Sequence, residues 1–402
     1  MMKNQLKIPL LACFCLFFAC KTPKNGTNTE GSKTATTATT ANSKGSKTVP
    51  VRGVWLTSVV SDAFKSKENL QNAVKNCADN GFNTIFVVVW NRGRTLYPSQ
   101  TMKNLIGIES DELLKGRDIL KETIDAAKPY NIQVFAWFEF GFSCDYSDKN
   151  EYDGKTQGKE ILQAKPHWAA LDRDGKIVKK NGFRWLNGFD PEVQNFMLSL
   201  LKEVVRDYPD LAGIQGDDRL PALPSEAGYD PLSISAFANE NDGKMPPSDP
   251  KESVWLDWKT GRMNDFMKRI HDELKALKPT VVISMSPSIY NWSKIEYLQD
   301  WPLWVKNGWV DMVCPQVYRY QFERYQKEIA LIKQQVGAEK LQTMVFPGIL
   351  LRVGDYYAPI DFLQKMVAEN RKYGINGEVF FYYEGLKKYP AFFRDLYKTP
   401  IK

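Results

Sequence analysis

Two adjacent carboxylates, Asp217 and Asp218, are the residues whose type and setting most readily suggest chemistry. They follow the apolar segment 211–216 directly and precede Arg219. Two like charges side by side are unfavourable unless water, partner groups or a substrate stabilises them. A helix cap or a solvated turn would also explain such a pair. A chemical role for the pair therefore requires a second acid that could act with it.

Glu139 is the second candidate acid, because it lies within the aromatic run 137–142. A carboxyl group in an apolar pocket has a raised pKa, which suits a general acid. Cleavage of a glycosidic bond needs two carboxyl groups, of which one protonates the leaving oxygen and the other attacks the sugar or activates water. Glu139 is the proposed acid/base, and the Asp217–Asp218 pair supplies the nucleophile or base.

Eight short apolar segments, each followed by a helical pattern, must position these acids. Continuous apolar runs are typical of strands buried on both faces of a parallel sheet. The expected strands are 52–59, 82–90, 132–138, 211–216, 280–286, 310–318, 341–348 and 377–383. The expected helices are 66–80, 113–130, 191–208, 254–278, 293–307, 322–336, 359–373 and 386–397.

This alternation predicts an α/β fold of the (β/α)₈ TIM-barrel type. Long loops follow the third and fourth strands, so both lie on the C-terminal face of the barrel, where active sites are built. A doubly wound open sheet is the alternative. That fold usually carries a glycine-rich phosphate loop after an early strand, and this sequence has none.

Other polar and aromatic residues near the strand ends are candidates for binding substrate, because aromatic faces stack on sugar rings and amides bind hydroxyl groups. The set is Trp90, Asn91, Arg94, Tyr290, Trp292, Gln316, Tyr318, Arg319 and Glu384. Arginines at such positions are also common salt-bridge partners, and Glu384 could equally cap the last helix.

We expect no metal site and no cofactor. The sequence holds two histidines, and once the leader is set aside its cysteines are Cys77, Cys144 and Cys314, without a CxxC motif. This argues against zinc and against a disulfide framework. The acidic residues between 145 and 153 fit no standard calcium spacing, so we expect a solvated loop. Asp172-Arg173-Asp174-Gly175 predicts a hairpin turn.

The N-terminus has the pattern of a bacterial lipoprotein signal. Lys3 and Lys7 precede a short apolar run that ends at Cys20. We expect a signal peptide over 1–19, lipidation of Cys20, a disordered tether over 20–49 and a catalytic domain over 50–402. An ordinary cleaved secretory signal is the alternative. Lys21 favours the outer membrane, so the expected location is the cell envelope, on the periplasmic or surface face.

Composition limits the possible partners. The formal net charge of +7 comes largely from the lysine-rich N-terminal segment, and no basic stripe with interleaved aromatics follows it. We therefore expect no nucleic acid to bind. The expected partners are a polysaccharide substrate and the membrane that holds the lipid anchor, and we expect a monomer.

Several motifs together resemble the glycosyl hydrolase-like 10 family of bacterial barrel proteins, over about 50 to 385. They are Arg52-Gly53-Val54-Trp55-Leu56-Thr57, Gly81-Phe82-Asn83-Thr84, Trp90-Asn91 through Thr95-Leu96-Tyr97-Pro98-Ser99, Ala136-Trp137-Phe138-Glu139-Phe140-Gly141, Gly213-Ile214-Gln215 with Asp217-Asp218, and Asp300-Trp301-Pro302 with Pro315-Gln316-Val317-Tyr318-Arg319. The resemblance implies a TIM barrel and glycoside hydrolysis, on peptidoglycan glycan strands in some relatives. It also implies that Glu139, Asp217 and Asp218 occupy the family's acidic positions.

The fourth-strand segment 213–217 is also similar to a motif of the alpha-amylase clan, whose final Asp is the nucleophile. This similarity points to Asp217 rather than Asp218 for the chemistry. Two residues depart from the pattern of relatives: Gly216 replaces a larger residue, and Arg219 replaces His or Tyr. The amylase-type acid on the fifth strand is missing, since Ser286-Pro287-Ser288 holds no carboxylate. Glu139 must then be the acid.

The sequence thus predicts a glycosidase that acts on a polysaccharide. Peptidoglycan glycan strands are one candidate substrate. A non-catalytic carbohydrate-binding lipoprotein with the same fold is the main alternative. A metal-dependent hydrolase is a second one, and the shortage of histidines argues against it.

Overall fold

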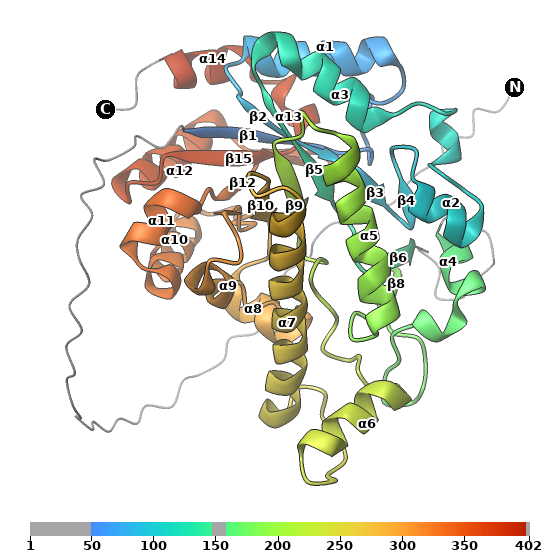
Figure 1. The fold of residues 1–402 in the computed structure, drawn as a ribbon. Helices are drawn as coiled ribbons and strands as arrows, with labels where there is room; N and C mark the ends of the chain where they lie inside the picture. Colours follow the sequence, from blue (N-terminus) through green and yellow to red (C-terminus); the bar gives the residue numbers. More distant parts are fainter. Residues whose placement is uncertain (1–49, 147–157, 399–402) are drawn as a thin grey trace, which may run out of the picture. The chain divides into compact units, whose positions relative to one another are not determined.

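Eight parallel strands form the central sheet of the computed structural model. The structure describes residues 50–146 and 158–398 (Figure 1). The expected signal peptide, Cys20 and the tether lie outside the described residues. The sheet order is β11-β10-β9-β5-β2-β1-β15-β12. The strands are β1 (Val51–Leu56), β2 (Thr84–Val88), β5 (Gln133–Phe138), β9 (Gly213–Gly216), β10 (Val282–Met285), β11 (Met312–Val313), β12 (Gly348–Leu350) and β15 (Gly377–Phe381).

The two outer strands of this order, β11 and β12, are joined by parallel bridges just outside their ends. Val313 pairs with Val345, and Gln316 pairs with Gly348. The backbone N–H of Phe346 donates to the carbonyl of Val313 at 2.9 Å, and that of Gly348 donates to Pro315 at 2.8 Å. The sheet thereby closes on itself, which confirms the barrel.

A helix follows each barrel strand, so the predicted alternation is confirmed. These helices are α1 (Lys67–Asp79), α3 (Ile119–Ala127), α5 (Pro191–Asp207), α7 (Ser253–Leu277), α9 (Trp301–Asn307), α10 (Phe322–Val336), α12 (Ile360–Lys372) and α14 (Pro390–Lys398). Local sequence explains where they begin. Ser66 accepts a hydrogen bond from the N–H of Asn69 and caps α1, as expected, while Asp190 caps α5 ahead of Pro191.

The seventh predicted strand was wrong over most of its length. Residues 338–344 form a helix, α11 (Ala338–Met344), and β12 begins only at Gly348. Leu341 is buried while Gln342 and Thr343 are exposed, which is one buried position per helical turn rather than strand alternation. Ala338, with the Glu and Lys that follow it, favours a helix.

Three other predicted helices are interrupted. The segment 293–307 is divided between α8 (Tyr290–Tyr297) and α9, because Leu298 adopts a left-handed conformation with φ of 61°. The last helix is divided into α13 (Tyr383–Leu386) and α14, and the segment 113–130 contains α3 flanked by the short 3₁₀ helices η1 (Glu112–Leu114) and η2 (Lys128–Tyr130).

Small elements fill the loops that follow the strands. A hairpin, β3 (Trp90–Asn91) and β4 (Arg94–Thr95), precedes α2 (Gln100–Ile106), which the sequence analysis did not predict. The loop after β5 holds β6 (Ser143–Tyr146), α4 (Lys159–Ala164), η3 (Pro166–Trp168), β7 (Lys179–Lys180) and β8 (Phe183–Trp185). The loop after β9 holds α6 (Pro231–Glu240), and β13 (Arg352–Val353) pairs with β14 (Tyr356–Tyr357). The predicted turn at Asp172 is confirmed by an antiparallel bridge from Leu171 to Ile177.

The barrel interior is filled by large side chains. Trp55 of β1 packs against Phe86 of β2 and Trp137 of β5, with ring centroids 5.9 and 6.2 Å apart. The Trp55 indole N–H donates to Oε1 of Gln215 at 2.7 Å, and Gln215 in turn donates to Oγ of Ser284 at 2.9 Å. This layer closes the barrel below the C-terminal strand ends, so the site above it has a rigid floor.

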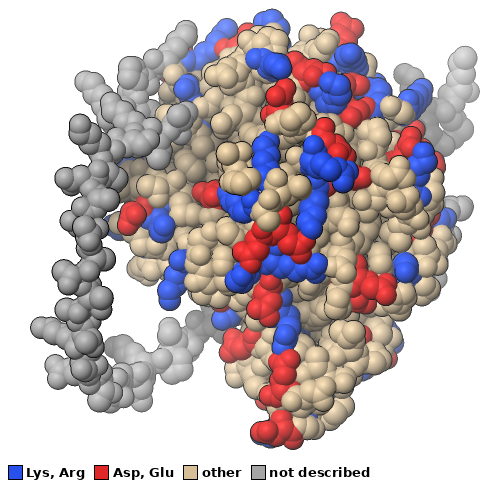
Figure 2. All heavy atoms as spheres, viewed as in Figure 1, with Lys and Arg blue, Asp and Glu red and all other residues tan. Residues whose placement is uncertain are grey.

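Charges on the face that contains α5 and α7 are of both signs. Figure 2 shows Lys and Arg side chains interspersed with Asp and Glu rather than gathered in one patch. Ion pairs explain the pattern, for example Arg269 with Glu273 at 2.7 Å and Lys202 with the same Glu273. Within 50–146 and 158–398, no helix has the length and apolar character needed to cross a membrane.

Candidate active site

Glu139 and Asp217 occupy matching positions on two neighbouring strands. Phe138 of β5 pairs in register with Gly216 of β9, so the next residue on each chain is Glu139 and Asp217. Adjacent strands lie about 4.8 Å apart, and side chains alternate between the two faces. Trp137 and Gln215 point into the barrel, as their contacts with Trp55 show. Two positions further on, both acids therefore face the barrel axis.

The Glu139 carboxyl group is buried and hydrogen-bonded on both oxygens. The Thr57 hydroxyl lies 3.2 and 3.1 Å from its two oxygens, and the Asn91 amide donates to Oε2 at 3.2 Å. Burial raises the pKa of Glu139 to about 7, although the hydrogen bond from Thr57 and the charges of Arg219 and Arg92 oppose the increase. A carboxyl group with this pKa can hold and release a proton near neutral pH, as a general acid/base must.

Asp217 is also buried, and its pKa is raised well above the ordinary value. Burial is the main cause, the neighbouring Asp218 carboxylate adds to it, and the Arg219 guanidinium opposes it. One oxygen of Asp217 accepts the backbone N–H of Arg219 at 2.8 Å, and the other lies 3.7 Å from its Nη1.

Asp218 forms the closer ion pair with Arg219. Its Oδ1 accepts a hydrogen bond from Nη1 at 2.8 Å. The guanidinium lies over the rings of Phe140 and Phe183, at 5.0 and 5.6 Å from their centroids. Asp218 is therefore the member of the pair that contacts the guanidinium of Arg219 most closely, as a charge-assisted hydrogen bond does.

The turn that carries these acids is tightly fixed. A Cβ atom at Gly216 would lie 2.4 Å from the carbonyl oxygen of Leu220 and 2.7 Å from the sulfur of Met285. The Gln299 amide donates to the carbonyl of Asp217 at 2.8 Å. The absence of a side chain at Gly216 is what lets residues 217–220 fold back closely over the strand end.

Among the predicted substrate-binding residues, Asn91 contacts an acid directly, through Glu139. Trp90 is fully buried and its indole donates to the carbonyl of Gly141 at 2.8 Å, so it supports the loop from the core. Arg94 forms an ion pair with Glu160 at 2.8 Å, and Arg319 forms one with Glu328 at 3.1 Å. Both arginines thus take the salt-bridge role.

The remaining predicted binding residues lie in the loops after the fifth, sixth and eighth strands. Trp292 packs on Tyr297 at 5.2 Å and Tyr318 packs on Phe381 at 5.2 Å, both half-buried. Burial and Asp300 raise the pKa of the half-buried Tyr290. The Gln316 amide donates to the carbonyl of Ser286 at 3.0 Å.

Glu384 ties two loops together rather than standing free. Its Oε1 accepts from the Ser61 hydroxyl at 2.9 Å and from the N–H of Asp62 at 3.1 Å, while Lys387 pairs with Oε2 at 2.5 Å. It lies in the first turn of α13. These contacts reach the loop after β1 rather than the first N–H groups of α13, whose N-cap residue makes no side-chain hydrogen bond, so they do not correspond to the capping alternative.

Two residues next to Glu139 were missed in the sequence analysis. Thr57 follows β1 two positions after the inward-facing Trp55, so strand alternation could have identified it. Arg92 occupies the β3–β4 turn and is close enough to lower the pKa of Glu139. Arg94, two residues later, was the predicted binding residue, and no sequence signal marked the turn that holds Arg92.

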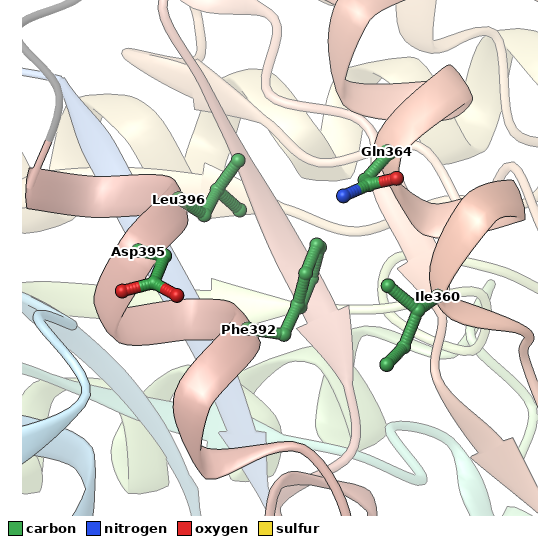
Figure 3. Close-up of a pocket in the computed structure, with 5 residues that line it drawn as sticks. All are labelled: Ile360, Gln364, Phe392, Asp395 and Leu396. Carbon is green, nitrogen blue, oxygen red and sulfur yellow. The ribbon is translucent and has the colours of Figure 1, made fainter.

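The part of the chain that the structure describes contains no group of three or more His, Cys, Asp or Glu side chains that could hold a metal ion. A groove of about 400 Å³ lies between α12 and α14 (Figure 3). Ile360, Gln364, Phe392, Asp395 and Leu396 line it. With one carboxyl group and mainly apolar walls, it lacks the paired acids that the strand ends provide.

A barrel whose fourth strand ends in paired acids beside a buried glutamate is the arrangement expected of a glycosidase. The model of the family described as glycosyl hydrolase-like 10 matches residues 50–354. The chain belongs to this family. The match includes Glu139, Asp217 and Asp218 but not Glu384.

Named glycosyl hydrolases are distant relatives of the chain. The chain is 23% identical over 306 residues to glycosyl hydrolase YngK of Bacillus subtilis, covering 67% of this chain and 54% of that protein. It is 24% identical over 308 residues to glycosyl hydrolase DigH of Escherichia coli K12, covering 67% of this chain and 65% of that protein. The matched region thus spans between about half and two thirds of these relatives.

Solved structures show the same fold at low identity. The catalytic domain of a beta-amylase from Paenibacillus polymyxa superposes with a TM-score of 0.58 at 10% identity, covering 84% of this chain and 93% of that one. A GH42 beta-galactosidase from Geobacillus stearothermophilus superposes with a TM-score of 0.56 at 12% identity, covering 82% of this chain and 50% of that one. The glycosyl hydrolase-like 10 chain therefore has a TIM-barrel fold.

Proposed function

We propose that this protein hydrolyses a glycosidic bond in a polysaccharide, with Glu139 as the general acid/base and Asp217 as the nucleophile or base. The observation that supports this most strongly is the register of β5 and β9. It sets the two acids side by side, facing the barrel axis, at the end where TIM-barrel active sites are built. Peptidoglycan glycan strands are the proposed first substrate to test.

In the proposed reaction Glu139 begins protonated and gives its proton to the leaving glycosidic oxygen. Thr57 and Asn91 orient its carboxyl group. Asp217 must lose its proton before it attacks the sugar or activates water. Arg219 favours this loss, because its guanidinium lies beside both carboxyl groups of the pair. Asp218 keeps Arg219 in place and does not itself react.

Two isosteric variants test these roles. Glu139→Gln and Asp217→Asn should each reduce the hydrolysis of purified glycan strands by at least about 1,000-fold, because each removes a group that reacts. Products would be measured by mass spectrometry, together with a panel of other polysaccharides, and glycan binding would be measured on the same proteins. Asp242→Asn, an exposed position, is the control.

Full activity in either variant would contradict the role of that acid. Binding of glycan by the unaltered protein without turnover of any polysaccharide in the panel would instead favour the carbohydrate-binding alternative.

A further inference from the structure

Arg92 stands out among the arginines near the candidate site because of what it contacts. Arg94 pairs with Glu160, Arg184 with Asp145 and Arg319 with Glu328. The Arg92 guanidinium lies over the ring of Tyr146, with its central carbon 5.0 Å from the centroid. Across 50–146 and 158–398 it has no carboxylate partner, and its buried Nε atom has no hydrogen-bond acceptor.

The fold holds Arg92 firmly in this position. It has a left-handed backbone with φ of 49°, followed by Gly93 with φ of 69°, in the two-residue turn of the β3–β4 hairpin. A side chain other than glycine rarely adopts this conformation, and such strain concentrates at functional sites. Gly158 packs against the turn so closely that a Cβ there would lie 2.3 Å from the Arg92 carbonyl oxygen.

The turn also places Arg92 next to the acids. The preceding residue, Asn91, donates to Glu139, and the positive charge of Arg92 lowers the pKa of Glu139. Tyr146 contacts Phe183 with centroids 4.9 Å apart, and Phe183 contacts Phe140 at 4.8 Å. One aromatic cluster thus carries two guanidinium groups. Arg219 on one side pairs with Asp218, and Arg92 on the other lacks a carboxylate partner among the described residues.

We propose that Arg92 is a specificity-determining residue that binds an anionic group, a carboxylate or a sulfate, on a sugar bound beside Glu139. A half-buried guanidinium that is fixed by an aromatic ring is pre-organised for two parallel hydrogen bonds to such a group. The substrate class is then an acidic polysaccharide. This inference deepens the proposed function, since it concerns the same cleft, but its test measures binding and does not require turnover.

The experiment compares acidic oligosaccharides with neutralised forms of the same molecules by calorimetry. The first pair of probes is peptide-free glycan strands with the lactyl carboxylate either free or converted to an amide. The second pair is oligogalacturonides, either free or methyl-esterified. The third pair is heparin-derived oligosaccharides before and after desulfation. These three pairs distinguish a lactyl carboxylate, a uronate and a sulfate. The proteins are the full chain, Arg92→Gln, Arg92→Lys and Arg173→Gln.

Arg173→Gln is the matched control, because Arg173 is an exposed arginine in the loop after β5 and its replacement changes the net charge as much as Arg92→Gln does. The full chain should bind the acidic form of one pair at least about 10-fold more tightly than its neutral form, as expected for a charge-assisted pair. Arg92→Gln should abolish this preference, Arg92→Lys should retain part of it, and Arg173→Gln should keep it. Thermal unfolding of each variant establishes that it is folded.

Two results would overturn the inference: no preference by the full chain in any of the three pairs, or an unchanged preference in Arg92→Gln. The inference would also be overturned if Arg92→Gln shifted the pH profile of hydrolysis but left the ratio of the affinities for the acidic and the neutral form unchanged. Arg92 would then act only on the pKa of Glu139. Failure of the proposed glycosidase function can be distinguished from failure of this inference. In that case the glycan would bind in a way that depends on Arg92, but the bound glycan would not be hydrolysed.

Discussion

At the scale of single residues, the burial of Glu139 and Asp217 supports one of the roles proposed for them and opposes the other. Burial raises the pKa of both groups, and the mechanism needs one of them protonated and the other ionised. The Arg219 guanidinium lowers the pKa of both acids, and its direct contact with the Asp217–Asp218 pair favours the ionised form of Asp217 that the proposed mechanism requires. Pairs of acids whose environments differ in this way are a usual basis for assigning acid and base.

The pH dependence of hydrolysis should follow from these two groups. Activity should fall as the pH rises through about 7, because Glu139 then loses the proton that it must donate. It should also fall as the pH decreases through the raised pKa of Asp217, because the base is then protonated. The profile of kcat/KM should therefore be bell-shaped, with its alkaline limit near neutral pH.

Asp218→Asn should move both limits toward acid, by roughly one pH unit. The Asp218 charge raises the pKa of both Asp217 and Glu139, and its removal also leaves Arg219 to pair with Asp217. The measurement is kcat/KM against pH for this variant and for the exposed control Asp242→Asn, which should keep the original profile. A profile that does not move in Asp218→Asn would show that Asp218 is electrostatically separate from the reacting acids.

At the scale of elements, the turn after β9 depends on a residue that has no side chain. Gly216→Ala would place a methyl group against the Leu220 carbonyl and the Met285 sulfur, so the turn must shift. We expect a loss of roughly 1–3 kcal/mol in the free energy of unfolding. Displacement of Asp217 by about 1 Å should reduce kcat by about 100-fold.

Gly261→Ala is the matched control, because no atom lies within 4 Å of its Cβ position in α7. This variant should be more stable by roughly 0.5–1 kcal/mol, with unchanged kcat. Urea unfolding measures the free energy of unfolding of each variant, and steady-state kinetics measures its kcat. Equal stability and equal activity of the two variants would mean that the turn is not held by close packing at Gly216.

The order of strands and helices could be predicted from sequence because buried parallel strands are almost continuously apolar. Segment 132–138 is an example, and its strand was predicted to within one residue of β5. The seventh strand could not be predicted in the same way. Leu341 to Phe346 is also largely apolar, and an apolar run of this length does not distinguish a strand from a helix.

The candidate site was only partly predictable for a related physical reason. Glu139 and Asp217 follow strands, so alternation determines where they point. Arg94 and Arg319 follow strands too, but their direction depends on turns and on partners such as Glu160 and Glu328 that lie far away in sequence. Arg92 lies in a left-handed turn whose shape depends on packing against Gly158, which no local pattern reveals.

At the scale of the whole barrel, ion pairs connect the long loops over the C-terminal face. Lys180 of β7 contacts Glu226 at 3.1 Å and Glu296 at 2.9 Å, and Lys251 also pairs with Glu296. These residues belong to the loops after β5, β9 and β10. A charge network of this kind is more stabilising than isolated surface pairs. The loops are thus fixed to one another as well as to the barrel.

The lipid anchor proposed at Cys20 would place this barrel next to an envelope polymer. We expect Cys20→Ser to move the protein from the membrane fraction to the soluble fraction, because the acylated residue is the expected anchor. The measurement is fractionation of cells in low and in high salt, with detection of the chain by antibody. Hydrophobic anchoring by acyl chains should resist high salt, whereas adsorption of the lysine-rich N-terminal segment to anionic lipid should be released by it.

The same fractionation distinguishes a lipid anchor at Cys20 from the alternative, an ordinary cleaved secretory signal. In that case the unaltered protein would already be soluble, and Cys20→Ser would change nothing. Hydrolysis of soluble oligosaccharides should be equal in the two proteins, because Cys20 precedes the matched domain that begins at residue 50. Hydrolysis of the intact polymer in cells should fall in Cys20→Ser, since loss of the anchor lowers the concentration of enzyme beside its substrate.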